Sequence, residues 1–232
     1  MLLVHGAWHG SWCWQPVVDR LLARGVEVQT IDLPSRGNPS GDLHGDARAV
    51  RSSVDSLGRP VVLVGHSYGG AVIGEASAGS TDVSRLVFLA ALVLDVGETA
   101  YSASRAHPDT GRPVTPDTPQ VMEVGEDKMV RCRPELAVEL FYHDCEENEA
   151  ARAVSLLVPQ PLATLTQAAG GAGWKDTPST YVLCRDDRIL EPATQRRLAA
   201  RCSDAVDLPT SHSPFLSAPD ALAEILVGCL SA

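Results

Sequence analysis

The chain has 232 residues, a length typical of one compact α/β domain with one active site. With 44% hydrophobic and 21% charged residues, it can bury a sizeable core and lacks the composition of a disordered protein. The formal net charge of −10 and the lack of a dense basic stretch argue against nucleic acid as a partner.

The first residues, from Met1 to Gly6, contain no positively charged leader, and their apolar run is too short for a signal peptide or a membrane span. We therefore expect a cytoplasmic protein that does not insert into a membrane. Six cysteines lie far apart without any C-x-x-C pair, which predicts buried free thiols and no zinc or redox site. The sequence does not determine the oligomeric state, and both a monomer and a homodimer are compatible with it.

Short apolar runs alternate along the chain with segments that have the length and spacing of helices. The expected strands are residues 1–5, 26–31, 61–65, 85–89, 180–184 and 205–208. The expected helices between them are residues 14–23, 46–57, 71–78 and 194–201. This alternation predicts an α/β fold with a mostly parallel sheet and helices on both faces.

The alternation is interrupted between about residues 95 and 177. No convincing strand is apparent there, Pro and Gly cluster at 108–119, and residues 136–157 have a helix-like apolar spacing. Because sites in open α/β folds lie beyond the carboxyl ends of the strands, we expect this insertion to form a small helical cap over the sheet. The chain is then predicted to be a single domain, 1–232, with the cap insertion at about 95–177.

The segment Gly65-His66-Ser67-Tyr68-Gly69 matches the pattern G-x-S-x-G between a β-branched run and a helical segment. A five-residue pattern can arise by chance, so its context is what makes it informative. A nucleophile elbow needs a strand, a sharp turn flanked by glycines, and a helix whose N-terminus faces the site. All three occur here in order, and we predict that Ser67 is a nucleophile.

A serine hydroxyl needs a histidine to take its proton and a carboxylate to orient that histidine. In chains with a nucleophile elbow, the acid and the histidine come after the serine in the sequence. Of the seven histidines, only His212 lies after the strand expected at 180–184, so His212 is the predicted base. Asp186 and Asp187 directly follow that strand, and Asp95, after an earlier strand, is a third candidate for the acid.

The oxyanion of an acyl-transfer reaction needs two N–H donors, one after the nucleophile and one from the loop after the first strand. We predict the backbone amides of Tyr68 and Ala7, with Gly6 permitting the required turn. His5 and His9 are four residues apart, but the Gly-rich turn between them breaks helical register. We therefore expect no metal site.

Taken together, these segments resemble the α/β-hydrolase branch that contains plant methyl-ester esterases, hydroxynitrile lyases and many small bacterial hydrolases. The resemblance spans nearly the whole chain. Its segments are Leu3-Val4-His5-Gly6-Ala7-Trp8-His9-Gly10 with Trp12, Asp32-Leu33-Pro34, Gly65-His66-Ser67-Tyr68-Gly69-Gly70, Phe141-Tyr142, Asp187 before Pro192, and Ser211-His212-Ser213-Pro214-Phe215. The resemblance implies a triad of Ser67, Asp187 and His212, and its spacing favours Asp187 over Asp186. It also implies the oxyanion donors Ala7 and Tyr68.

Two departures from this branch bear on the reaction. The resembling hydroxynitrile lyases have a threonine at the position of Gly6 and a lysine at the position of Ser213, directly after the catalytic histidine. The lysine balances the charge of released cyanide, which neither Gly6 nor Ser213 can do. We therefore expect hydrolysis and not lyase activity.

The sequence thus predicts a serine esterase that cleaves a small, largely apolar carboxylic ester through an acyl-enzyme, without cofactor or metal. The same triad would serve a thioesterase, a lactonase or a biosynthetic tailoring hydrolase, and a non-catalytic ligand-binding member of the fold is the alternative from another class. The candidate substrate-binding residues are Gly6, Trp8, Trp12, Phe141 and Tyr142. Each aromatic residue among them could equally belong to the core.

Overall fold

The computed structural model describes residues 1–104 and 122–230. Its central sheet has six parallel strands in the order β2-β1-β3-β4-β8-β9. The strands are β1 (Leu2–Val4), β2 (Gln29–Ile31), β3 (Val61–His66), β4 (Val83–Leu89), β8 (Ser179–Cys184) and β9 (Asp204–Leu208). The predicted α/β fold with a mostly parallel sheet is confirmed. The strand expected at 26–31 is shorter than predicted, because the Val26 amide still bonds to the Leu21 carbonyl of the preceding helix.

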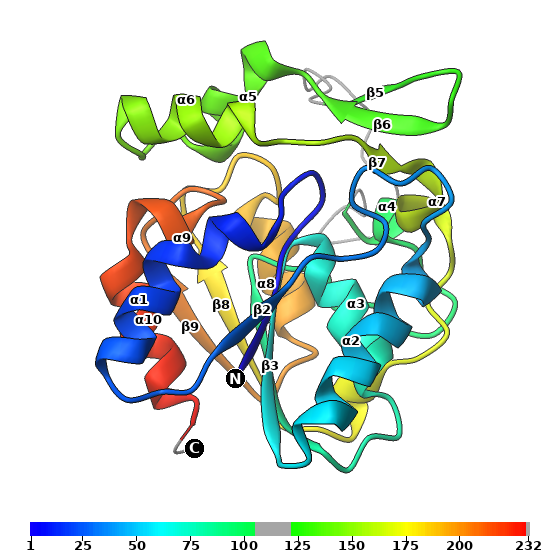
Figure 1. Cartoon of the computed structure of the whole chain (residues 1–232), viewed down its shortest axis with the longest axis vertical. Coiled ribbons are helices and arrows are strands. Elements are labelled where there is room, and N and C mark those ends of the chain that lie inside the picture. The colour runs from blue at the N-terminus through cyan, green and yellow to red at the C-terminus, as the bar shows by residue number, and fades with distance from the viewer. Residues whose placement is uncertain (105–121, 231–232) are drawn as a thin grey trace.

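Helices cover both faces of this sheet, with α1 and α10 on one face and α2 and α3 on the other (Figure 1). The helices around the sheet are η1 (Ser11–Trp14), α1 (Gln15–Ala23), α2 (Leu43–Leu57), α3 (Tyr68–Ser77), α8 (Pro192–Ala199), α9 (Pro214–Ser217) and α10 (Pro219–Gly228). The Asp42 carboxylate caps α2 by accepting the Gly45 amide at 2.6 Å, and Gly58 ends the helix with a φ of 58°. All six residues of β3 are buried, as expected of a central strand covered on both faces.

The segment between β4 and β8 includes a layer that lies across the carboxyl ends of the strands (Figure 1). Its elements are α4 (Ala100–Ser104), β5 (Met122–Val124), β6 (Met129–Cys132), α5 (Pro134–Phe141), α6 (Glu147–Ser155), β7 (Gln160–Pro161), α7 (Leu162–Thr166) and η2 (Gly173–Lys175). We call β5 to β7, with α5 and α6, the cap. The run expected to be helical at 136–157 is two helices, and the Pro- and Gly-rich stretch at 108–119 lies outside the described residues.

The cap also contains a sheet that the sequence did not predict. Strands β5, β6 and β7 pair antiparallel in that order, and Val130 of β6 is the register partner of Gln160 of β7. Each of these strands has only two to four residues. Such segments are too short for the apolar alternation by which a strand is recognised in a sequence.

Two further sequence expectations concern the membrane and the cysteines. Within residues 1–104 and 122–230, no helix combines the length and apolar character needed to cross a membrane. All six cysteines have free thiols. Cys13, Cys184 and Cys229 are buried, whereas the other three are half-exposed.

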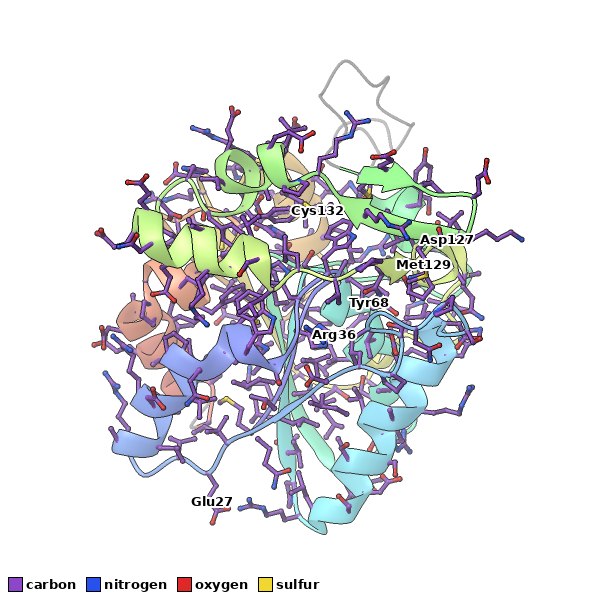
Figure 2. The ribbon with its side chains drawn as sticks, turned by 45° about the horizontal axis from the view of Figure 1, so that its top comes forward. Glu27, Arg36, Tyr68, Asp127, Met129 and Cys132 are labelled. Carbon is purple, nitrogen blue, oxygen red and sulfur yellow. The ribbon has the colours of Figure 1, made fainter. Side chains whose placement is uncertain are left out.

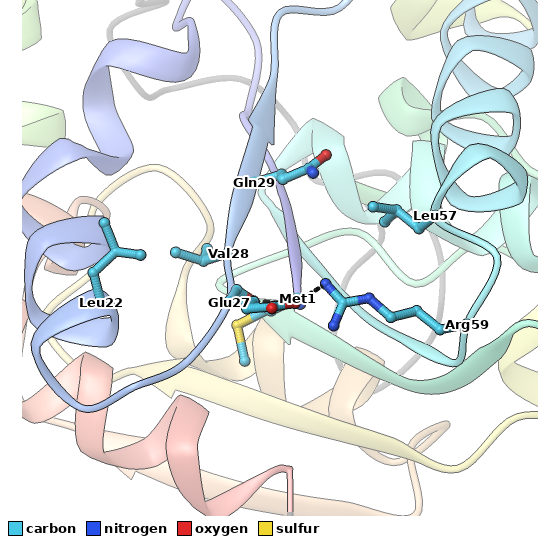
Figure 3. Close-up of a pocket in the computed structure, with 7 residues that line it drawn as sticks. All are labelled: Met1, Leu22, Glu27, Val28, Gln29, Leu57 and Arg59. Carbon is cyan, nitrogen blue, oxygen red and sulfur yellow. Dashed lines mark hydrogen bonds and ion pairs between the residues drawn. The ribbon is translucent and has the colours of Figure 1, made fainter.

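A pocket of about 360 Å³ opens beside the first residues of β1 and β2 (Figure 3), at the end of the sheet opposite to the cap (Figure 1). It is lined by Met1, Leu22, Glu27, Val28, Gln29, Leu57 and Arg59. The Met1 ammonium donates to the Glu27 carbonyl oxygen at 2.9 Å, and Arg59 forms an ion pair with the Glu27 carboxylate. None of the predicted catalytic residues lines this pocket.

Candidate active site

Ser67 occupies the sharp turn between β3 and α3. Its φ of 52° and ψ of −119° are unusual for a residue with a side chain, and this strained geometry is that of a nucleophile elbow. The Ser67 amide donates to the Leu89 carbonyl at 3.1 Å, and the Ser67 carbonyl accepts the amides of Gly70 and Leu92. The backbone of the turn is therefore fixed to both β4 and the start of α3.

Glycines let the strands and α3 approach each other at this turn. A Cβ atom at Gly65 would lie 2.5 Å from the Gly69 carbonyl oxygen, and one at Gly69 would lie 2.7 Å from the Val4 and His5 carbonyl oxygens. A Cβ atom at Gly6 would lie 2.9 Å from the Ser67 Cβ. The loop after β1 is thus in direct contact with the side chain of Ser67.

His212 lies in the loop between β9 and α9, and its ring is paired with Asp187 from the loop after β8. The distance from His212 Nδ1 to Asp187 Oδ2 is 2.7 Å, and both side chains are buried. Asp187 Oδ1 also accepts the amides of Ile189 and Leu190, and Oδ2 accepts Gln195 Nε2. Because the Asp187 oxygens accept from every side, His212 Nδ1 is the donor and its Nε2 is left to accept a proton.

The other two candidate acids lie elsewhere. Asp186 is exposed, and its carbonyl oxygen accepts His143 Nε2 at 3.0 Å. The Asp95 carboxylate accepts Lys175 Nζ at 2.5 Å on the surface, and this hydrogen bond lowers the pKa of Asp95. Of the three aspartates, the structure places only Asp187 against His212.

A second histidine, His66, packs beside His212. Its Nε2 donates to the His212 carbonyl oxygen at 2.9 Å, and the two ring centroids are 4.6 Å apart. Burial lowers the pKa of His66 well below its ordinary value, and nearby His212 lowers it further. A neutral His66 therefore supports the loop of His212 without placing a second positive charge beside it.

His5 and His9, which suggested a metal pair by spacing, are both engaged in hydrogen bonds. His5 Nε2 accepts the Leu33 amide at 3.0 Å, and burial lowers the pKa of His5 to about 4. His9 Nδ1 donates to the Ala7 carbonyl at 2.9 Å, its Nε2 accepts from the Tyr142 hydroxyl at 2.8 Å, and burial lowers the pKa of His9 to about 3. These neutral rings fix the backbone of the loop after β1.

The family follows from a comparison with known proteins. A family model described as the alpha/beta hydrolase family matches residues 1–225. The chain belongs to this family. The alpha/beta hydrolase nvfD of Aspergillus novofumigatus is 31% identical, and the alignment covers 97% of this chain and 94% of that protein.

Solved structures give the same assignment for this alpha/beta hydrolase. A pyrethroid hydrolase from Sphingobium faniae is 25% identical with a TM-score of 0.82, and the match covers 100% of this chain and 96% of that one. A methylesterase from Arabidopsis is also 25% identical, with a TM-score of 0.79 and coverage of 100% and 99%. The similarity therefore extends through both the sheet and the cap.

The predicted substrate-binding aromatics are largely buried in this hydrolase. Phe141 packs against both His212 and Trp8, with ring centroids 5.7 and 5.9 Å away. Tyr142 is fully buried and directs its hydroxyl to His9, and Trp12 stacks on the same imidazole at 5.6 Å. Phe141 thus lies between Trp8 and His212, whereas Tyr142 and Trp12 pack around the loop after β1.

The cap also holds the loops of the acid and the histidine. Ser211 donates its hydroxyl to the Phe141 carbonyl at 3.0 Å and its amide to the Asp144 carboxylate at 2.8 Å. His143 Nε2 bonds the carbonyl of Asp186, next to the candidate acid. The segment between α5 and α6 therefore ties the two loops together from above.

Two buried groups near the site were missed by sequence reasoning. Gln195, from α8, donates to Asp187 Oδ2 and is itself held by the Cys184 amide at 3.0 Å. Asp46, from the first turn of α2, accepts the hydroxyl of Tyr68 at 2.8 Å. A polar residue within an amphipathic helix is normally predicted to face solvent. No local sequence signal identifies the side chain of Gln195 or of Asp46 as buried.

Proposed function

We propose that this alpha/beta hydrolase is a carboxylic ester hydrolase that uses Ser67, His212 and Asp187 as a catalytic triad. The observation that carries the proposal is the buried 2.7 Å contact of His212 with Asp187, combined with the strained backbone of Ser67. Similarity to proteins named as a methylesterase and a pyrethroid hydrolase supports an ester as the substrate.

In the proposed reaction, Ser67 Oγ attacks the carbonyl carbon of the ester while His212 Nε2 takes the hydroxyl proton. The amides of Ala7 and Tyr68 donate to the oxyanion, each contributing a few kcal/mol to its stability. His212 then gives its proton to the leaving alcohol as the C–O bond breaks. A water molecule, deprotonated by His212, attacks the acyl group on Ser67 and releases the acid.

A small, largely apolar substrate is proposed because an aromatic side chain adjoins His212. Phe141 lies beside the ring of His212 and offers an apolar surface near the reacting atoms. Lyase chemistry is disfavoured by Gly6, which lies beside Ser67 and lacks the side chain of the threonine found in the resembling lyases. The threonine that resembling lyases have at position 6 would bring its Cβ to 2.9 Å from that of Ser67.

The experiment is a turnover panel with wild-type protein and Ser67→Ala. We expect wild type to hydrolyse p-nitrophenyl acetate and small methyl esters faster than acyl-thioesters and lactones, and Ser67→Ala to lose at least about a thousandfold in kcat. Preferred turnover of a thioester or a lactone would replace the ester in the proposal. Equal activity of Ser67→Ala and wild type would refute the triad.

A further inference from the structure

A buried carboxylate outside the triad, that of Asp46, lies beside the nucleophile elbow. Asp46 has no exposed surface and accepts three hydrogen bonds: from the Ser35 amide at 2.9 Å, the Ser35 hydroxyl at 2.6 Å and the Tyr68 hydroxyl at 2.8 Å. Burial raises the pKa of this carboxyl, and the hydrogen bonds from Ser35 and Tyr68 oppose the rise. A buried carboxylate satisfied in this way holds its partners in one arrangement.

This hydrogen-bond network continues into the cap. Because the Ser35 hydroxyl donates to Asp46, its oxygen is free to accept Gln160 Nε2 at 3.2 Å. Gln160 belongs to β7 and also donates to Thr164 at 3.1 Å. Figure 2 shows Tyr68 beneath the cap, on whose strand β6 Met129 and Cys132 are labelled. The side chain of Tyr68, the residue after Ser67, is thus connected to Gln160 of β7 through the side chains of Asp46 and Ser35.

The loop that carries Ala7 is hydrogen-bonded, through Trp8, to strand β6 of the cap, which pairs with β7. Trp8 directly follows Ala7 and has a φ of 62°, a conformation that few residues with side chains adopt. Its indole Nε1 donates to the carbonyl of Val130 in β6 at 2.9 Å, and its carbonyl accepts the amide of Val158 at 2.9 Å. Val130 is the register partner of Gln160.

We infer that Asp46 and Trp8 are positioning residues for the oxyanion hole, and that the β6–β7 pair of the cap is their common anchor. The inference rests on the proposed function, which assigns the two oxyanion donors. Asp46 fixes the start of α3 through the Tyr68 hydroxyl, and Trp8 fixes the loop after β1 through its indole. Oxyanion donors act only when held at the position of the developing charge, so their supports affect the rate without binding the substrate.

The test uses two substitutions that leave both backbone donors in place, Tyr68→Phe and Trp8→Phe. Each removes one anchoring hydrogen bond and keeps an aromatic ring. We expect kcat for p-nitrophenyl acetate to fall about tenfold in each variant, with KM changed less than twofold. The inhibition constant of phenylboronic acid should rise by a similar factor, because its tetrahedral adduct with a serine occupies the oxyanion hole.

Matched control variants remove the same kinds of group, a tyrosine hydroxyl and a tryptophan N–H, at other buried positions. Tyr181→Phe deletes a buried hydroxyl that bonds the Ala91 carbonyl at 2.9 Å, and Trp14→Phe deletes a buried indole N–H that has no partner within the described residues. Both controls should keep wild-type kcat and boronate affinity even where the melting temperature falls. If Tyr68→Phe and Trp8→Phe behave like these controls, the inference is wrong.

Two further variants test the path itself. Asp46→Ala removes the acceptor of the Tyr68 hydroxyl and Tyr68→Phe removes that hydroxyl, so their combination should lose no more activity than the stronger single change. Gln160→Met touches neither donor, yet should lower kcat with KM retained. Fully additive losses, or a Gln160→Met variant with wild-type kcat, would contradict the common anchor.

Failure of the inference differs from failure of the proposed function. If Ser67→Ala is inactive while all anchor variants keep wild-type kcat and boronate affinity, only the inference fails. If wild-type protein neither hydrolyses esters nor binds the boronate in a thermal-shift titration, the proposed function fails and the inference fails with it.

Discussion

Asp187 and His212 form a buried pair in which Asp187 Oδ2 lies 2.7 Å from His212 Nδ1. Asp187 has no acceptor position left for another partner, because two amides and Gln195 occupy the positions that His212 does not. The carboxylate therefore selects the tautomer of His212 that leaves Nε2 unprotonated. This relationship distinguishes Asp187 from its neighbour Asp186, which the residues alone did not separate.

The first prediction concerns this choice of acid. Asp187→Asn should lower kcat for p-nitrophenyl acetate by roughly a thousandfold or more, because an amide that donates to His212 favours the wrong tautomer. Asp186→Asn is the matched control: its side chain is exposed, and its backbone contact with His143 survives the change. A large loss in Asp186→Asn with an active Asp187→Asn would reverse the assignment.

The second prediction concerns the close approach of α3 to β1. Gly69→Ala should destabilise the protein by about 1–3 kcal/mol or more, because the new Cβ would lie 2.7 Å from two backbone carbonyl oxygens that cannot rotate away. Gly74→Ala in the same helix meets no atom within 4 Å and should stabilise the protein by about 0.5–1 kcal/mol. Urea unfolding of both variants measures this, and equal effects of the same sign would contradict the packing.

The third prediction concerns acid stability. Burial lowers the pKa values of His5 to about 4 and of His9 to about 3, so both rings stay neutral in the folded protein while the unfolded chain protonates them below about 6.5. The unfolded state then binds more protons, so the free energy of unfolding falls as pH drops from about 6.5 toward 4. Each such histidine contributes a slope of up to about 1.4 kcal/mol per pH unit.

Urea titrations at several pH values between 7.5 and 5 check this slope. At lower pH, Asp46 changes the free energy of unfolding in the opposite direction. Burial raises its pKa, so the folded state takes up this proton at a higher pH than the unfolded chain does. His9→Gln preserves a donor and an acceptor but does not titrate, so this variant should show a shallower loss of stability. A free energy of unfolding that is flat or rises from pH 6.5 to 5 would contradict the neutral state of these rings.

The elbow could be predicted from the sequence because it depends on local features: a strand, flanking glycines and a helix within a short segment. The loop of His212 could be predicted for a related reason, since the order of elements along the chain places it beyond the last strand. Asp187 could not be separated from Asp186 without the resemblance, because both follow β8 and the turn decides which side chain points inward.

The supporting network was beyond prediction for a different reason. Asp46, Gln160 and Trp8 are far apart in the sequence. Gln160 and Trp8 reach their partners only through the placement of the cap over the sheet, and Asp46 reaches Tyr68 through the packing of α2 against α3. The cap strands that bring them together are only two to four residues long and show no periodicity. Long-range polar contacts of this kind leave no mark in local composition or spacing.

The central claim is that Ser67 is an activated nucleophile, and covalent labelling tests it most directly. Wild-type protein should react with a fluorophosphonate probe to one adduct per chain, located on Ser67 by peptide mass spectrometry, with hydrolysis of p-nitrophenyl acetate lost in proportion. Ser67→Ala should take up no label. Labelling that is absent, lies on another residue, or leaves hydrolysis intact would contradict the account.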